Sequence, residues 1–159
     1  GGTTAIIDVP TRQTRDERRS APPPLSSGTP VAPPVHSQRI RLLLADDHAL
    51  LLKGLAEMLV EHPDINLVAE AHNGREAVEK TLALRPDIVL MDVTMPVMDG
   101  IEATRCIKEG APETQVIGFS MHGYEGMARR MKDAGAATFL SKTISIEELI
   151  ATIVGLARR

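Results

Sequence analysis

From Arg39 onward, short apolar runs alternate with longer segments in which apolar residues recur every three or four positions. This alternation is typical of strands followed by amphipathic helices. Short strands so apolar are covered on both faces, which favours a parallel sheet between two helical layers. The strands are expected at 40–45, 65–71, 87–91, 116–120 and 138–140, and the helices at 49–61, from Asn73 to before Pro86, from Asp99, at 124–134 and from Ser145.

Three of the expected helices carry the same start signal. A short polar residue stands at the N-cap position, and a glutamate follows three residues later, so that each can bond the backbone of the other. The pairs are Asn73 with Glu76, Asp99 with Glu102, and Ser145 with Glu148.

The first 38 residues have a different composition. They hold seven of the 11 prolines. They carry four Arg against two Asp and one Glu, a net charge of +1; because the whole chain has a net charge of −3, residues 39–159 carry −4. Proline-rich, weakly charged sequence buries too little apolar surface to offset its ordering entropy. We therefore expect a flexible linker at 11–38 and a folded domain at 39–159.

Composition excludes several classes of protein. The single cysteine, Cys106, rules out an intrachain disulfide, and no apolar run approaches the roughly 18 residues of a membrane helix. A net charge of −3 argues against a broadly basic nucleic-acid surface. We expect a cytoplasmic chain with no membrane contact and no direct nucleic-acid binding.

Polar side chains follow four of the five expected strands. Asp46 and Asp47 come after the first strand, Asp92 after the third, Ser120 after the fourth and Lys142 after the fifth. In an open parallel sheet, functional groups collect at the carboxyl ends of the strands. Three carboxylates, a hydroxyl and an ammonium group are therefore expected to meet at one edge.

The chemistry of such a cluster points to phosphoryl transfer. Crowded carboxylates repel each other unless a hard divalent cation such as Mg²⁺ lies among them, and a carboxylate can attack phosphorus to form an acyl phosphate. The transferred group needs a cation and a hydrogen-bond donor, which Lys142 and Ser120 supply. His48 has no second His or Cys at metal-ligand spacing, which argues against a zinc site.

Residues 39–159 resemble the receiver domain of the two-component response-regulator family. The resemblance rests on Asp46-Asp47, on the string LMDVTMPVMDG at 90–100, on Ser120 and on Lys142, three residues after Phe139. The triplet Asp-Asp-His at 46–48 resembles the nitrate-regulator-like branch. The family resemblance implies a flavodoxin-like, doubly wound α/β fold whose five parallel strands have the order 2-1-3-4-5, with five helices.

The resemblance also implies a metal site and a phosphoacceptor. Asp92 would accept a phosphoryl group from phosphohistidine on a histidine kinase or a phosphotransfer domain. Asp47 would bind Mg²⁺ directly and Asp46 through water, with Asp92 and the carbonyl of Thr94 as further ligands.

Three more residues receive roles from the resemblance. Lys142 would hold a phosphoryl oxygen, Ser120 would be the switch hydroxyl, and Phe139 stands where the family has its rotating aromatic. Movement of Ser120 and Phe139 would re-aim the face formed by the fourth helix, the fifth strand and the fifth helix. Thr143 departs from the proline that many members carry after the lysine.

Residues 1–10 resemble the glycine loop and last strand of a histidine-kinase ATP-binding domain. On that interpretation the chain is the C-terminal receiver of a hybrid sensor kinase. Alternatively, Gly1-Gly2 is a cloning remnant before an incidental strand, and the chain is a stand-alone adaptor or a transcription regulator without its output domain.

A true enzyme is the competing class. Phosphatases of the haloacid-dehalogenase type also use a strand-end aspartate with Mg²⁺, but they need a second aspartate two residues after the nucleophile. Thr94 stands at that place. A receiver catalyses only its own phosphorylation and dephosphorylation, so it turns over no external substrate as a conventional enzyme does.

Overall fold

The computed structural model describes residues 39–121 and 125–158. The expected kinase remnant at 1–10 and the expected linker at 11–38 lie outside these residues. The strands are β2 (Ile40–Ala45), β3 (Ile65–Ala71), β4 (Ile88–Asp92), β5 (Gln115–Ser120) and β6 (Thr138–Ser141). The helices are α2 (Ala49–Val60), α3 (Gly74–Leu84), α4 (Gly100–Gly110), α5 (Glu125–Ala134) and α6 (Ile146–Ala157).

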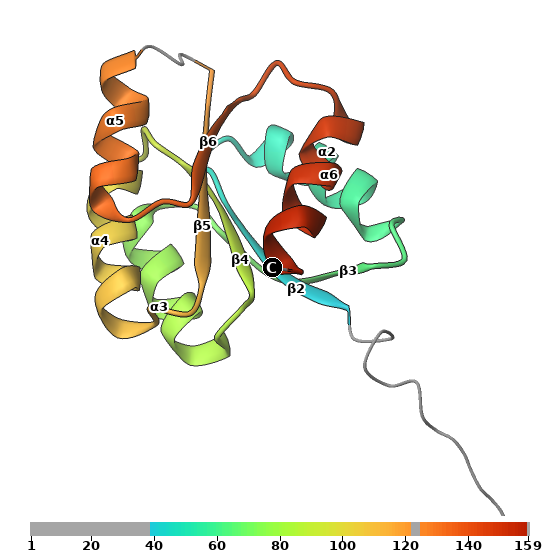
Figure 1. Ribbon diagram of the computed structural model, residues 1–159, viewed down its shortest axis with the longest axis horizontal. Helices are drawn as coiled ribbons and strands as arrows, with labels where there is room; N and C mark the ends of the chain where they lie inside the picture. Colours follow the sequence, from blue (N-terminus) through green and yellow to red (C-terminus); the bar gives the residue numbers. More distant parts are fainter. Residues whose placement is uncertain (1–38, 122–124, 159) are drawn as a thin grey trace, which may run out of the picture. The chain divides into compact units, whose positions relative to one another are not determined.

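The five strands form one parallel sheet in the order β3-β2-β4-β5-β6. Counted along the chain, this is the order 2-1-3-4-5, so the fold prediction is confirmed. Figure 1 shows α3, α4 and α5 on one side of the sheet and α2 and α6 on the other. The carboxyl ends of all strands therefore meet at one edge.

Each face of the sheet has its own apolar core. On β2, Leu43 packs toward α3, α4 and α5, whereas Leu42 and Leu44 pack toward α2 and α6. All three leucines are at most 1% exposed. Because neighbouring residues of a strand point to opposite faces, a continuous apolar run is needed to fill both layers.

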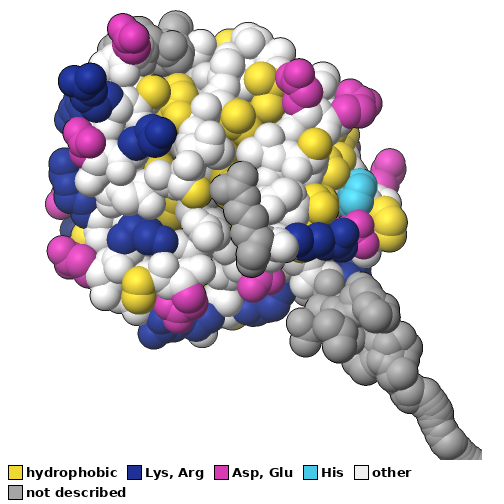
Figure 2. Space-filling view, in the orientation of Figure 1, with side chains coloured by type: hydrophobic (Ala, Val, Ile, Leu, Met, Phe, Trp, Pro, Cys, Tyr) yellow, Lys and Arg dark blue, Asp and Glu magenta, His cyan; other side chains and the backbone are white. Residues whose placement is uncertain are grey.

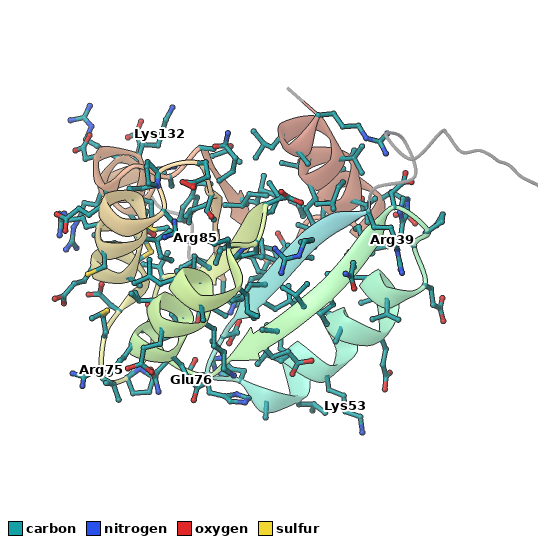
Figure 3. The ribbon with its side chains drawn as sticks, turned by 90° about the horizontal axis from the view of Figure 1, so that it is seen from below. Arg39, Lys53, Arg75, Glu76, Arg85 and Lys132 are labelled. Carbon is teal, nitrogen blue, oxygen red and sulfur yellow. The ribbon has the colours of Figure 1, made fainter. Side chains whose placement is uncertain are left out.

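The helix starts follow the capping pairs in the sequence. The side chains of Asn73, Asp99 and Ser145 accept hydrogen bonds from the backbone N–H three residues later. At α3 the Glu76 carboxylate reaches back past the N-cap and accepts from the backbone N–H of His72 at 2.9 Å. Figure 3 shows Glu76 at this helix start.

Two details differ from the sequence pattern. The strand expected at 87–91 runs one residue later, at Ile88–Asp92. The backbone of Asp87 still bonds to Arg41 and Gln115, and its carboxylate accepts a hydrogen bond from the Arg41 N–H at 2.9 Å. Met58, which continues the apolar spacing of α2, is 47% exposed. The apolar stripe of α2 is wider than the face that the sheet covers, since only Leu52, Leu55 and Leu59 are buried.

Backbone hydrogen bonds hold the loop after β4 to the starts of α3 and α4. The N–H of Gly74 donates to the carbonyl of Met98 at 2.9 Å, and the N–H of Gly100 donates to the carbonyl of Val93 at 2.8 Å. A Cβ atom at Gly74 would lie 2.1 Å from the Met98 carbonyl oxygen, and one at Gly100 would lie 2.1 Å from that of Asp92. Both positions therefore require glycine.

The outer surface mixes both signs of charge. Figure 2 shows Lys and Arg side chains on the side where Figure 1 has α4 and α5, with Asp and Glu side chains between them. No helix among the described residues combines the length and the apolar character that crossing a bilayer requires.

Candidate functional site

The predicted polar side chains lie together at the carboxyl edge of the sheet. Asp92 is the last residue of β4, and Asp46 directly follows β2; both are buried, at 4% and 2% exposure. A pocket of about 400 Å³ opens beside them. Its lining residues are Asp47, His48, Asp92, Thr94, Ser120, Met121 and Lys142.

Lys142 joins the two buried carboxylates. Its Nζ lies 2.5 Å from Asp46 Oδ2 and 3.3 Å from Asp92 Oδ1, and its side chain is 3% exposed. The backbone N–H of Lys142 donates to the Ser120 carbonyl at 2.9 Å, which fixes the start of the loop after β6. A buried ammonium between two buried carboxylates partly offsets their desolvation.

Burial and, after it, the negative charge of Asp46 raise the pKa of the Asp92 carboxyl from 3.8 to about 6, although Lys142 opposes the shift. At neutral pH the carboxylate is ionised. It is therefore free of a proton and able to act as a nucleophile.

The donor set fits a divalent cation. One ligand atom from each of Asp46, Asp47, His48 and Asp92 lies within 4.8 Å of all the others. Carboxylate oxygens so close together are the ligands that Mg²⁺ prefers, and Mg²⁺ keeps its remaining positions for water and substrate oxygens. The pocket beside the carboxylates leaves room for those ligands.

The comparison with known families agrees with this geometry. The family model of the response regulator receiver domain matches residues 42–154. This chain belongs to the response regulator receiver family.

The relatives that this receiver domain matches are longer than the matched segment. The chain is 44% identical over 106 residues to a protein-glutamate methylesterase/protein-glutamine glutaminase of Alkalilimnicola ehrlichii, covering 65% of this chain and 27% of that protein. It is 35% identical over 114 residues to the response regulator GacA of Pseudomonas viridiflava, covering 72% of this chain and 53% of GacA. The chain thus spans about a quarter to a half of the length of these relatives.

A solved structure shares the fold. The CheX–CheY–BeF3–Mg²⁺ complex from Borrelia burgdorferi matches with a TM-score of 0.70 and 29% sequence identity. The match covers 75% of this chain and 90% of that chain.

The remaining predicted residues of this receiver domain lie around the pocket or next to it. Thr94 is exposed and lines the pocket. Ser120 is 4% exposed, and its hydroxyl lies 3.7 Å from the sulfur of Met127 as a weak donor. Phe139 is half-buried on β6 and lies beside Gly118, where a Cβ atom would approach its ring to 2.8 Å.

The structure adds His48, for which the sequence argued only against a zinc site, to the acidic cluster. Its Nδ1 lies 3.0 Å from Asp46 Oδ1 and 3.2 Å from Asp47 Oδ1. Its neighbours are carboxylates, so the spacing of His and Cys residues does not reveal it. Its position directly after Asp47 does.

An apolar groove adjoins the pocket of this receiver domain. It has a volume of about 600 Å³ and runs along α2. Leu50 and Met121 are 84% and 58% exposed at its rim. The groove is lined by Leu50, Leu51, Leu55, Met58 and Met121, with His48 and Lys142 at the end next to the pocket.

The raised pKa of Asp92 makes a prediction about stability. A carboxyl with a higher pKa in the folded state favours folding below its unfolded pKa of 3.8, and this contribution is lost as the pH rises through about 6. Without metal at pH 8, Asp92→Asn should therefore raise the free energy of unfolding by roughly 2 to 3 kcal/mol. The gain should shrink as the pH falls and disappear only below about pH 3, where the wild-type carboxyl is protonated in both states.

Urea unfolding in EDTA across this pH range measures the effect. Asp99→Asn is the matched control, because Asp99 is exposed and an asparagine caps α4 equally well. Parallel stability curves for the wild type and Asp92→Asn would contradict the prediction.

Proposed function

We propose that this receiver domain takes a phosphoryl group from phosphohistidine onto Asp92 with Mg²⁺ and thereby switches a signalling surface. The observation that supports this most directly is the meeting of Asp46, Asp92 and Lys142 at one strand edge, although Asp46 and Lys142 are 96 residues apart in the sequence. An ionised, buried carboxylate beside a buried ammonium and a roomy pocket is suited to attack on phosphorus.

The metal would be held by the acidic cluster. Asp47 and Asp92 would bind it directly, Asp46 through water, and the carbonyl of Thr94 would complete the protein ligands. When bound, Mg²⁺ supplies positive charge to the phosphoryl oxygens as negative charge spreads over them.

The transfer step needs no external base. An Asp92 carboxylate oxygen forms the new bond to phosphorus while the phosphorus–nitrogen bond of the donor breaks. The electron pair of that bond leaves with the imidazole, whose other ring nitrogen carries a proton in the phosphohistidine, so that the leaving group is a neutral histidine. The ammonium of Lys142 would bind an oxygen of the new phosphoryl group, since it already lies 3.3 Å from Asp92 Oδ1. Hydrolysis by water later restores the carboxylate and releases phosphate.

The switch would run from Ser120 to Phe139. A phosphoryl group on Asp92 would draw the Ser120 hydroxyl toward it, and Phe139 would turn inward. The two residues lie on adjacent strands, with β5 paired to β6 in parallel register. The exposed face of α5, β6 and α6 would change as a result, which is a local charge event that biases a two-state element.

Receiver domains take phosphoryl groups from histidine kinases or phosphotransfer proteins, and the apolar groove along α2 supports such a donor here. An amphipathic helix could bury Leu50 and Met121 while it brings a phosphohistidine to the pocket. This would explain why large apolar side chains remain exposed beside the site.

The test is to incubate the chain with Mg²⁺ and a small phosphodonor such as acetyl phosphate, and to measure the intact mass. The expected result is one acid-labile addition of about 80 Da. The absence of an addition, or steady release of phosphate from an aryl phosphate, would contradict the proposal and favour a phosphatase.

The position of this receiver in a longer protein stays a prediction. The hybrid-kinase interpretation rests on residues 1–10 alone, and the alternatives are a stand-alone adaptor and a regulator without its output domain. A cytoplasmic location is likewise part of the proposal, because histidine-kinase phosphodonors act there.

A further inference from the structure

One polar side chain of the cluster has no role in the proposed function. His48 is the N-cap residue of α2, and its backbone N–H donates to Asp46 Oδ1 at 2.8 Å. This bond holds the backbone of His48, and therefore the base of its side chain, next to the acidic cluster. The ring itself is 67% exposed and lines the pocket together with Asp47 and Asp92.

The imidazole is close enough to share an ion with the carboxylates. The four ligand atoms of Asp46, Asp47, His48 and Asp92 all lie within 4.8 Å of one another. Two ligands on opposite sides of an ion stand roughly 4.0 to 4.8 Å apart when each bond is about 2.0 to 2.4 Å long. The spacing of the cluster therefore suits a single ion, with small side-chain adjustments only.

We propose that His48 is a nitrogen ligand of the cation in this site, and that it gives the site a preference for a first-row transition-metal dication such as Mn²⁺ over Mg²⁺. The proposal rests on the proposed function, because it concerns the same cation site. Mg²⁺ strongly prefers oxygen ligands, whereas imidazole suits the transition-metal dications. Mn²⁺ also accepts the carboxylate and water ligands that serve Mg²⁺.

The surroundings of His48 allow this role. Its side chain is 67% exposed, so it has room to change its torsion angles. The polar atoms next to Nδ1 are the carboxylates of Asp46 and Asp47. A cation among these carboxylates would meet the same ring nitrogen that now faces them.

The competing role is a positioning one, in which the imidazole only orients the two carboxylates by hydrogen bonding. Electron spin echo envelope modulation on the full chain loaded with Mn²⁺ separates the two roles. A bound imidazole should give a nitrogen coupling in the wild type, and His48→Gln should lose it. His62→Gln is the control, because the His62 ring accepts a hydrogen bond from the Asp64 backbone and lies outside the cluster.

Calorimetric titration gives a second readout. His48→Gln should weaken Mn²⁺ binding about tenfold or more and change Mg²⁺ binding by less than about twofold. Absence of the nitrogen coupling in the wild type, or an equal loss of affinity for both ions in His48→Gln, would overturn the proposal.

The result is independent of the phosphorylation test. If acetyl phosphate and Mg²⁺ add a phosphoryl group but Mn²⁺ shows no nitrogen coupling, the ligand role of His48 is wrong and the proposed function stands. If the coupling is present and no phosphoryl group is added, the proposed function fails and the metal ligand stands.

Discussion

Asp92→Asn should abolish the mass gain of about 80 Da that acetyl phosphate and Mg²⁺ produce in the wild type. An amide lacks the ionised oxygen that attacks phosphorus, and the substitution preserves the shape of the side chain. The comparison is made by intact mass under identical conditions. The expected difference is complete loss rather than a slower reaction.

Asp99→Asn is the matched control for this experiment. Asp99 lies seven residues further on and caps α4, so its loss removes an equal charge from the same region without touching the pocket. This control should take up the phosphoryl group as the wild type does. A mass gain in Asp92→Asn, located at another residue by peptide mapping, would move the phosphoacceptor and contradict the assignment.

Lys142→Met should be the most destabilising single substitution at the site. The change leaves Asp46 and Asp92 buried without the ammonium that lies between them, and removing one partner of a buried ion pair costs about 3 kcal/mol or more. Urea unfolding at pH 8 in EDTA measures the loss. The loss should shrink at pH 5, because Asp92 takes up a proton and its buried charge disappears.

Two further variants test the cause of that loss. Adding Asp46→Asn to Lys142→Met removes one of the uncompensated charges and should recover part of the stability. Lys132→Met on α5 is the matched control, since Lys132 is exposed (Figure 3) and should change stability by no more than about 0.5 kcal/mol. Equal losses in Lys142→Met and Lys132→Met would exclude a structural role for the buried ammonium.

Much of the fold could be predicted because its signals are local. The capping pairs at Asn73, Asp99 and Ser145 give the helix starts, and the side-chain bonds they imply are present. The apolar runs place all five strands within one residue of their observed ends. At β4 both ends lie one residue later than expected.

The prediction of the site depended on one non-local rule. Parallel strands end at the same edge, so residues after different strands meet there, and this placed Asp46, Asp92 and Lys142 together. Finer contacts could not be predicted from the sequence. The approach of the His48 ring to two carboxylates depends on the turn between β2 and α2, and the exposure of Met58 depends on how much of α2 the sheet covers.

The loop that follows Asp92 makes the site stiff on one side. Backbone hydrogen bonds join it to Gly74, the first residue of α3, and to Gly100, the first residue of α4. At both glycines the backbone of the loop is so close that it cannot move nearer to either helix. The pocket leaves room for a phosphoryl group on Asp92, but the loop itself is held in place by these bonds. We therefore expect a conformational response to Asp92 to occur on the opposite side of the pocket, at Ser120 of β5 and Phe139 of β6.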